Sequence, residues 1–118
     1  MKYDRELIGD VLVIRIREQK LTSHEAPEMK TALLGFTLEE EEKILINMSE
    51  VKYMDSTGMG SFLFGIRQAD QHEKDMRFCC IQSRIQQLIR IAQLGEVIDF
   101  YKSEDEAIKE FAREDGND

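Results

Sequence analysis

The chain has 118 residues, of which 42% are hydrophobic and 34% charged, and its formal net charge is −8. This size and composition predict one globular domain over residues 1–118, with an acidic tail that frays from about residue 114. The acidic balance argues against a nucleic-acid partner, because such partners select concentrated basic side chains. No apolar run reaches the length of a membrane span and the start is charged, so we expect a cytoplasmic protein without a membrane partner.

The apolar pattern predicts strands and helices in alternation. Strands are expected where apolar side chains alternate or run continuously, and helices where they recur at spacings of three and four residues. In chain order the expected elements are strands over residues 2–9 and 10–18, a helix over 23–36, a strand over 43–51, a helix over 60–73, a strand over 76–82, a helix over 84–95, a strand over 97–102 and a helix over 104–115.

This alternation predicts an α/β fold with a mixed sheet of about four to five strands and about four helices packed on it. The first two strands would form a hairpin through Gly9-Asp10. Pro27 lies in the first turns of its helix, where a missing N–H is tolerated. Gly95 is expected to cap the helix over 84–95.

Three helix starts match the capping box, in which a hydroxyl accepts one free backbone N–H and a Glu or Gln side chain accepts another. The three pairs are Thr22 with Glu25, Ser83 with Gln86, and Ser103 with Glu106.

The fourth start, Asp55-Ser56-Thr57-Gly58-Met59-Gly60, lacks the box. Counted from Asp55 the box position is Gly58, so no acidic side chain of the first turn neutralises the positive pole of this helix. Such a pole attracts anions, and phosphorylation would make Ser56 one by adding nearly two negative charges. Beside Asp55, that charge would alter partner binding rather than the fold. Gly58 and Gly60 would let another molecule approach closely.

An ordinary N-cap explains the same residues, with Ser56 or Asp55 satisfying backbone donors. On the residues alone both interpretations stay open. Thr57 is expected to help cap the helix and is the alternative phosphorylation site.

The two cysteines, Cys79 and Cys80, are neighbours in an apolar run. On a strand they would point to opposite faces, so we expect two small buried side chains rather than a redox or metal site. His24 and His72 lack the spacing of metal ligands. The sequence therefore predicts neither a metal nor a cofactor.

Residues 44–69, ILINMSEVKYMDSTGMGSFLFGIRQA, resemble the STAS domain of bacterial anti-sigma factor antagonists. The shared features are an apolar strand, a short polar loop, an aromatic-apolar pair at Tyr53-Met54, and the Asp-Ser/Thr-rich motif at 55–60. Residues 81–111 resemble the C-terminal half of the same family.

The resemblance implies a phosphorylation-controlled partner switch. In that family the unphosphorylated form binds an anti-sigma factor serine kinase, phosphorylation of the residue matching Ser56 releases it, and a PP2C-type phosphatase resets the switch. The chain would then be a monomer or weak dimer and not an enzyme, and it contains neither a Gly-x-Ser-x-Gly elbow nor a P-loop. The expected partner-binding residues are Asp55, Ser56, Thr57, Gly58, Met59, Gly60 and Phe64.

Met59 and Phe64 differ in their position relative to the apolar stripe of the helix. Met59 begins the apolar stripe of its helix, which favours a place in the core. Phe64 lies off that stripe and is the better candidate for an exposed contact; Met54 is a further candidate, since methionine surfaces adapt to partners.

One departure from the family pattern leaves open whether the switch acts on a sigma factor or on another target. Many members carry Gly-x-x-Asp in the loop after the second strand. In this chain Gln19 and Thr22 stand at the positions of that glycine and aspartate. A STAS scaffold or signalling subunit with a non-sigma output is therefore an alternative. Nucleotide binding at the Ser56 loop is another, disfavoured because Lys52 is the sole nearby lysine. The cytoplasmic tail of an anion transporter is disfavoured by the missing membrane segment.

Overall fold

The computed structural model describes residues 1–116. Its elements in chain order are β1 (Tyr3–Ile8), β2 (Val11–Ile16), β3 (Lys20–Leu21), α1 (Ala26–Thr37), β4 (Lys43–Asn47), β5 (Tyr53–Met54), α2 (Ser56–Gln71), β6 (Asp75–Cys79), α3 (Ser83–Ile91), β7 (Phe100–Tyr101) and α4 (Glu104–Glu114). The predicted α/β class is confirmed. Of the tail expected to fray, residues 117–118 lie outside the described part of the chain.

A five-stranded mixed sheet in the order β1-β2-β4-β6-β7 forms the centre. The antiparallel pair β1–β2 is the predicted hairpin, and Gly9 at its turn has a φ of +61°. The remaining pairs are parallel, because helical connections return the chain to the same edge of the sheet. A separate two-stranded ladder joins β3 to β5 in parallel, and the apolar pattern predicts neither strand.

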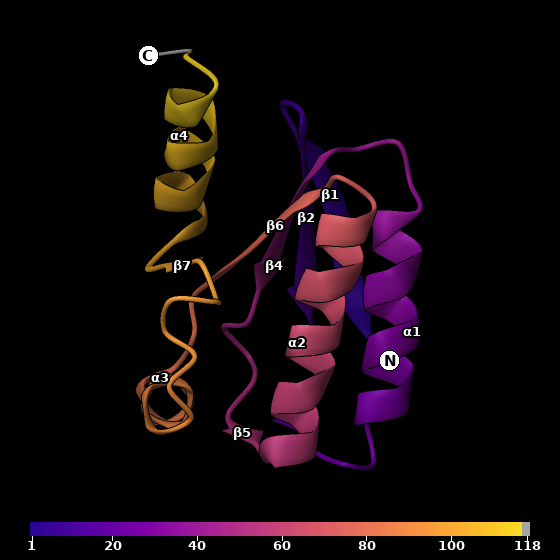
Figure 1. Cartoon of the computed structure of the whole chain (residues 1–118), viewed down its shortest axis with the longest axis vertical. Helices are drawn as coiled ribbons and strands as arrows, with labels where there is room; N and C mark the ends of the chain where they lie inside the picture. Colours follow the sequence, from indigo (N-terminus) through magenta and orange to yellow (C-terminus); the bar gives the residue numbers. More distant parts are fainter. Residues whose placement is uncertain (117–118) are drawn as a thin grey trace.

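Helices cover both faces of the sheet (Figure 1). α1 and α2 lie side by side on one face, and α4 lies on the other. The larger core lies beneath α1, α2 and α3, where the rings of Phe62 and Phe78 stack with centroids 4.9 Å apart. The smaller core lies beneath α4 and includes Phe111 and Cys79, and both cysteines are unpaired thiols.

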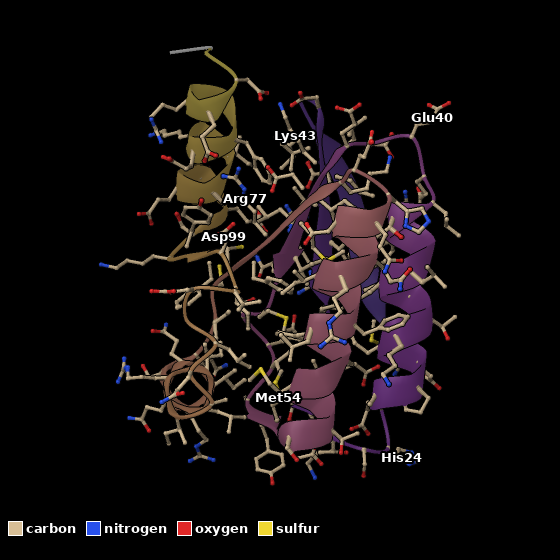
Figure 2. The ribbon with its side chains drawn as sticks, viewed as in Figure 1. His24, Glu40, Lys43, Met54, Arg77 and Asp99 are labelled. Atoms are coloured by element: carbon tan, nitrogen blue, oxygen red, sulfur yellow. The ribbon has the colours of Figure 1, made fainter. Side chains whose placement is uncertain are left out.

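Ion pairs supplement the small core beneath α4. The buried guanidinium of Arg77 donates to Asp75 and, at 2.7 Å, to Glu114 near the end of the helix. At the start of the helix, Arg15 Nε donates to Glu104 at 2.8 Å. Both ends of α4 are therefore tied to the sheet (Figure 2 labels Arg77).

Two of the predicted helix starts are confirmed in part. Ser103 caps α4 by accepting the N–H of Glu106, as predicted, but the Glu106 carboxylate accepts the N–H of Lys102 rather than that of Ser103. Thr22 bonds the Glu25 carboxylate through its N–H and its hydroxyl, but α1 begins at Ala26 with Glu25 as the N-cap residue. The Thr22–Glu25 pair thus closes the turn before the helix.

The predictions for α3 are wrong at both ends. Its N-cap residue is Gln82, without a side-chain cap, so Ser83 and Gln86 form no capping box. Gln86 instead donates to the carbonyl of Ile81. The helix ends at Ile91, and Gln93, with a φ of +60°, takes the left-handed conformation expected at Gly95.

Candidate functional site

Two loops meet at the N-terminal end of α2. The N–H groups of Lys52 and Tyr53 donate to the carbonyl of Gln19 at 2.8 and 3.1 Å, and the β3–β5 ladder follows directly. A further hydrogen bond between the same two segments runs from the N–H of Asp55 to the carbonyl of Leu21. The loop after β2 therefore fixes the residues that lead into α2 (Figure 1).

Asp55 is the N-cap residue of α2. Its Oδ1 accepts the N–H of Gly58 at 2.8 Å, and its Oδ2 accepts the N–H of Ser23 at 3.1 Å. The hydrogen bond from Gly58, and to a smaller extent the one from Ser23, holds the pKa of the Asp55 carboxyl below its ordinary value. The interpretation of an unneutralised helix pole is therefore wrong, because an ionised carboxylate just before the first turn occupies it.

Ser56 and Thr57 are the first two residues of α2, and both are exposed. Within residues 1–116, neither hydroxyl makes a hydrogen bond to another group of the chain. The expectation that Thr57 helps to cap the helix is wrong, since Asp55 has that role. Both interpretations of the sequence therefore apply, each to its own residue: Asp55 is the N-cap, and the neighbouring Ser56 keeps a free hydroxyl.

Gly58 and Met59 face the interior. A Cβ on Gly58 would lie 1.9 Å from the carbonyl oxygen of Leu21, so the glycine permits an approach within the chain rather than by another molecule. Met59 is 4% exposed and belongs to the core, in line with its place on the apolar stripe. Because both residues are buried, neither can contact a partner through a side chain.

Gly60 and Phe64 continue the outer surface of α2. No atom would lie within 4 Å of a Cβ on Gly60. Phe64 is half-buried, and the ammonium of Lys30 on α1 lies 5.7 Å from its ring centre. This surface runs along α2 from Ser56 toward α1, whereas Met54, at 6% exposed, lies mainly inside.

Sequence reasoning missed Leu21 and Ser23. Both hold the site through backbone atoms, the Leu21 carbonyl against Gly58 and the Ser23 N–H on Asp55. A contact made by backbone atoms between residues more than thirty positions apart leaves no pattern of side chains by which the sequence could predict it. Gln19, identified at the position of the missing family glycine, also acts through its carbonyl.

Residues 1–116 include no helix with the length and apolar character of a transmembrane segment.

Comparison with known proteins places the chain in a family. The model of the STAS domain family matches residues 2–107. An anti-sigma-B factor antagonist of Listeria monocytogenes is 29% identical over 87 residues, which cover 74% of this chain and 76% of that protein.

Two solved structures show the same fold. An anti-sigma-factor antagonist (STAS) domain protein from Planctomyces limnophilus superposes with a TM-score of 0.83 over 93% of this chain and 97% of the other, at 17% identity. The phosphorylated form of the Bacillus cell fate determinant SpoIIAA superposes with a TM-score of 0.67 over 93% and 99%, at 19% identity. With a family model that spans nearly all of its length, this chain belongs to the STAS domain family.

Proposed function

We propose that this protein is an anti-sigma factor antagonist that acts as a phosphorylation-controlled partner switch in the cytoplasm. Its unphosphorylated form binds and sequesters a serine kinase that doubles as an anti-sigma factor. Phosphorylation of Ser56 releases the kinase, and a PP2C-type phosphatase restores the binding form. Support comes from the curated relative named as an anti-sigma-B factor antagonist and from the likeness to a phosphorylated SpoIIAA.

The observation that carries the proposal is the free hydroxyl of Ser56 beside a capped helix start. Asp55 already satisfies the N–H of Gly58, so the fold does not need the Ser56 hydroxyl. The side chain is exposed at the first residue of α2, where a kinase active site can reach it.

The chemistry at Ser56 is a phosphoryl transfer. The γ-phosphoryl group of ATP passes to Ser56 Oγ, the hydroxyl proton passes to a base of the kinase, and ADP leaves. The phosphatase reverses the change by delivering water to the phosphorus, which returns the hydroxyl and inorganic phosphate. No group of this chain is required as a catalyst in either step.

The effect on binding follows from charge. Phosphoserine places nearly two negative charges next to the ionised Asp55, on a surface that the kinase contacts closely. Disrupting a buried polar contact at such an interface costs about 2–5 kcal/mol. Because 1.4 kcal/mol is a factor of ten in affinity, the modification weakens binding by roughly thirtyfold or more.

The test begins with the kinase. Capture from the source organism with the unmodified protein and with Ser56→Asp identifies proteins that bind the first and not the second, and the candidate kinase is then purified. With ATP it should phosphorylate the protein at one residue, which peptide mass spectrometry should locate at Ser56. Phosphorylation should be lost in Ser56→Ala and retained in Thr57→Ala.

Binding of the purified kinase, measured by calorimetry with ADP present, should be tight for the unmodified protein and for Ser56→Ala. It should be at least about tenfold weaker for Ser56→Asp. The unmodified protein should also displace a sigma factor from the kinase. Phosphate on Thr57 alone, or equal affinity for Ser56→Asp, would refute the proposed switch.

A further inference from the structure

A shallow groove adjoins the Ser56 site between β5 and α3. Its volume is about 210 Å³, and its lining includes Tyr53, Met54, Arg84, Ile85, Leu88 and Ile91. Figure 2 shows Met54 between α3 and the first turn of α2. The groove is therefore continuous with the loop that leads into Ser56; we call it the α3–β5 groove.

The α3–β5 groove has a buried apolar floor and exposed apolar walls. Met54 and Ile85 form the floor, at 6% and 1% exposed. Tyr53 and Ile91 stand at the walls, at 46% and 79% exposed. Single exposed apolar side chains are common on proteins, but two that flank one apolar hollow form a surface suited to a partner's apolar side chain.

Basic residues lie on or next to the elements that form this groove, and one of them, Arg84, lines it. α3 carries Arg84 and Arg90 and no acidic residue, although the whole chain has a net charge of −8. Lys20 lies opposite Tyr53 in the β3–β5 ladder, and Lys52 precedes it. All four residues are exposed, and we call this group on α3 and beside the β3–β5 ladder the basic rim.

The basic rim is not neutralised from within the described chain. No member of it forms an ion pair in residues 1–116. The two carboxylates closest to Lys52 in the sequence are engaged elsewhere, Glu50 with Arg17 and Asp55 with backbone N–H groups. The charge of the rim is therefore available to an acidic partner.

We propose that the α3–β5 groove and the basic rim form the second half of the kinase-docking surface, where the groove receives an apolar side chain carried on an acidic segment of the kinase. This inference rests on the proposed function and extends it from the Ser56 loop to α3. Apolar burial anchors the kinase, and the rim orients its acidic segment. A phosphate on Ser56 would also compete with that segment for the rim, which adds to release.

The test compares two groove variants with two matched controls, using the full chain and the purified kinase that phosphorylates Ser56. Ile91→Glu places a charge on the groove wall, and Arg84→Glu reverses a charge of the rim. Val97→Glu is the apolar control, since Val97 is 50% exposed but lies against the C-terminal half of α2. Lys109→Glu is the charge control, at an exposed position of α4. Circular dichroism and urea unfolding verify that all four variants fold.

We expect Ile91→Glu and Arg84→Glu to weaken kinase binding by about tenfold or more, with both controls within about twofold of the unmodified protein. Affinity of the unmodified protein should fall with added salt, and less steeply for Arg84→Glu. If both groove variants bind like the controls while Ser56→Asp still loses affinity, the groove is not a docking site and the proposed switch stands. If the unmodified protein and Ser56→Asp bind the kinase alike, the proposed function fails and this inference fails with it.

Two further measurements distinguish other occupants. Cosedimentation with phosphatidylserine vesicles that is lost in Ile91→Glu would assign the groove to a membrane surface. A dimer in analytical ultracentrifugation that dissociates in Ile91→Glu would assign it to a second copy of this chain. Either result would overturn the kinase-docking proposal, which expects a negative outcome in both.

Discussion

The carbonyl oxygen of Leu21 occupies the space where a side chain on Gly58 would begin, 1.9 Å from the position of its Cβ. Leu21 belongs to β3 and Gly58 to the first turn of α2, so the contact fixes how closely the loop after β2 approaches the Ser56 site. Ser23 extends the same connection by donating its N–H to Asp55.

Gly58→Ala should destabilise the protein, because β3 and α2 must separate to admit the methyl group. Overpacking of this kind costs about 1–3 kcal/mol. Gly60→Ala is the matched control: its Cβ would meet no atom within 4 Å, and alanine is favoured over glycine within a helix by about 1 kcal/mol. Urea unfolding should show a loss for the first variant and none for the second. Equal stability of the two would contradict the close approach.

Ser56→Asp should leave the stability unchanged or raise it by about 0.3–1 kcal/mol, because a negative charge is favourable at a helix N-terminus. Gln71→Asp places the same charge at the last residue of α2, where the pole is negative, and should lower the unfolding free energy by a similar amount. Thermal and urea unfolding of both variants measure the difference. A large loss of stability in Ser56→Asp would show that charge at this residue acts through the fold rather than through the surface.

Arg77→Ala should cost about 2–3 kcal/mol of unfolding free energy, because the buried guanidinium packs 4.2 Å from the Phe111 ring centre and bonds Asp75 and Glu114. Arg77→Met should cost less, since it keeps most of the packing beneath α4. Arg113→Ala, at an exposed site on the same helix, should have little effect in the same denaturation assay. A loss in Arg113→Ala as large as that in Arg77→Ala would show that burial is not the cause.

Stability should depend on pH through Glu104. The hydrogen bond from Arg15, assisted by one from Asn47, holds the Glu104 pKa below its ordinary value despite partial burial, which acts in the opposite direction. With a folded pKa below the unfolded one, the contribution is complete above the unfolded pKa of about 4.3 and disappears as pH falls through the folded pKa. The unfolded chain binds more protons in that interval.

Glu104→Gln should therefore be less stable than the unmodified protein at pH 7, and the difference should shrink in urea titrations below about pH 4. The exposed Glu96, which makes no hydrogen bond within residues 1–116, gives the control Glu96→Gln, with a small difference at every pH. A difference for Glu104→Gln that is constant from pH 7 to pH 3 would rule out its carboxylate as the cause.

Much of the fold could be predicted because its elements carry local signals. The alternation of β2 and the continuous apolar runs of β4 and β6 identify strands from the residues alone. The strands β3 and β5 have two residues each and exist through pairing with one another across the chain, so no local pattern identifies them. The end of α3 was also beyond sequence reasoning, because Gln93 adopts a conformation usually reserved for glycine.

The candidate site can be recognised in the sequence only where side chains, rather than backbone groups, form it. Asp55 and Ser56 follow from the motif, although the division of roles between cap and free hydroxyl required the observed bond to Gly58. The α3–β5 groove could not be foreseen, because Tyr53 and Ile91 meet only when β5 is placed beside α3. Tertiary contacts decide which apolar residues remain uncovered.

The start of α2 and the end of α4 lie at opposite ends of the molecule. The first turn of α2 lies at one pole, and the last turn of α4 lies at the other, on the far side of the sheet (Figure 1). A reporter or an additional module joined after α4 would project away from Ser56 and leave its approach unobstructed.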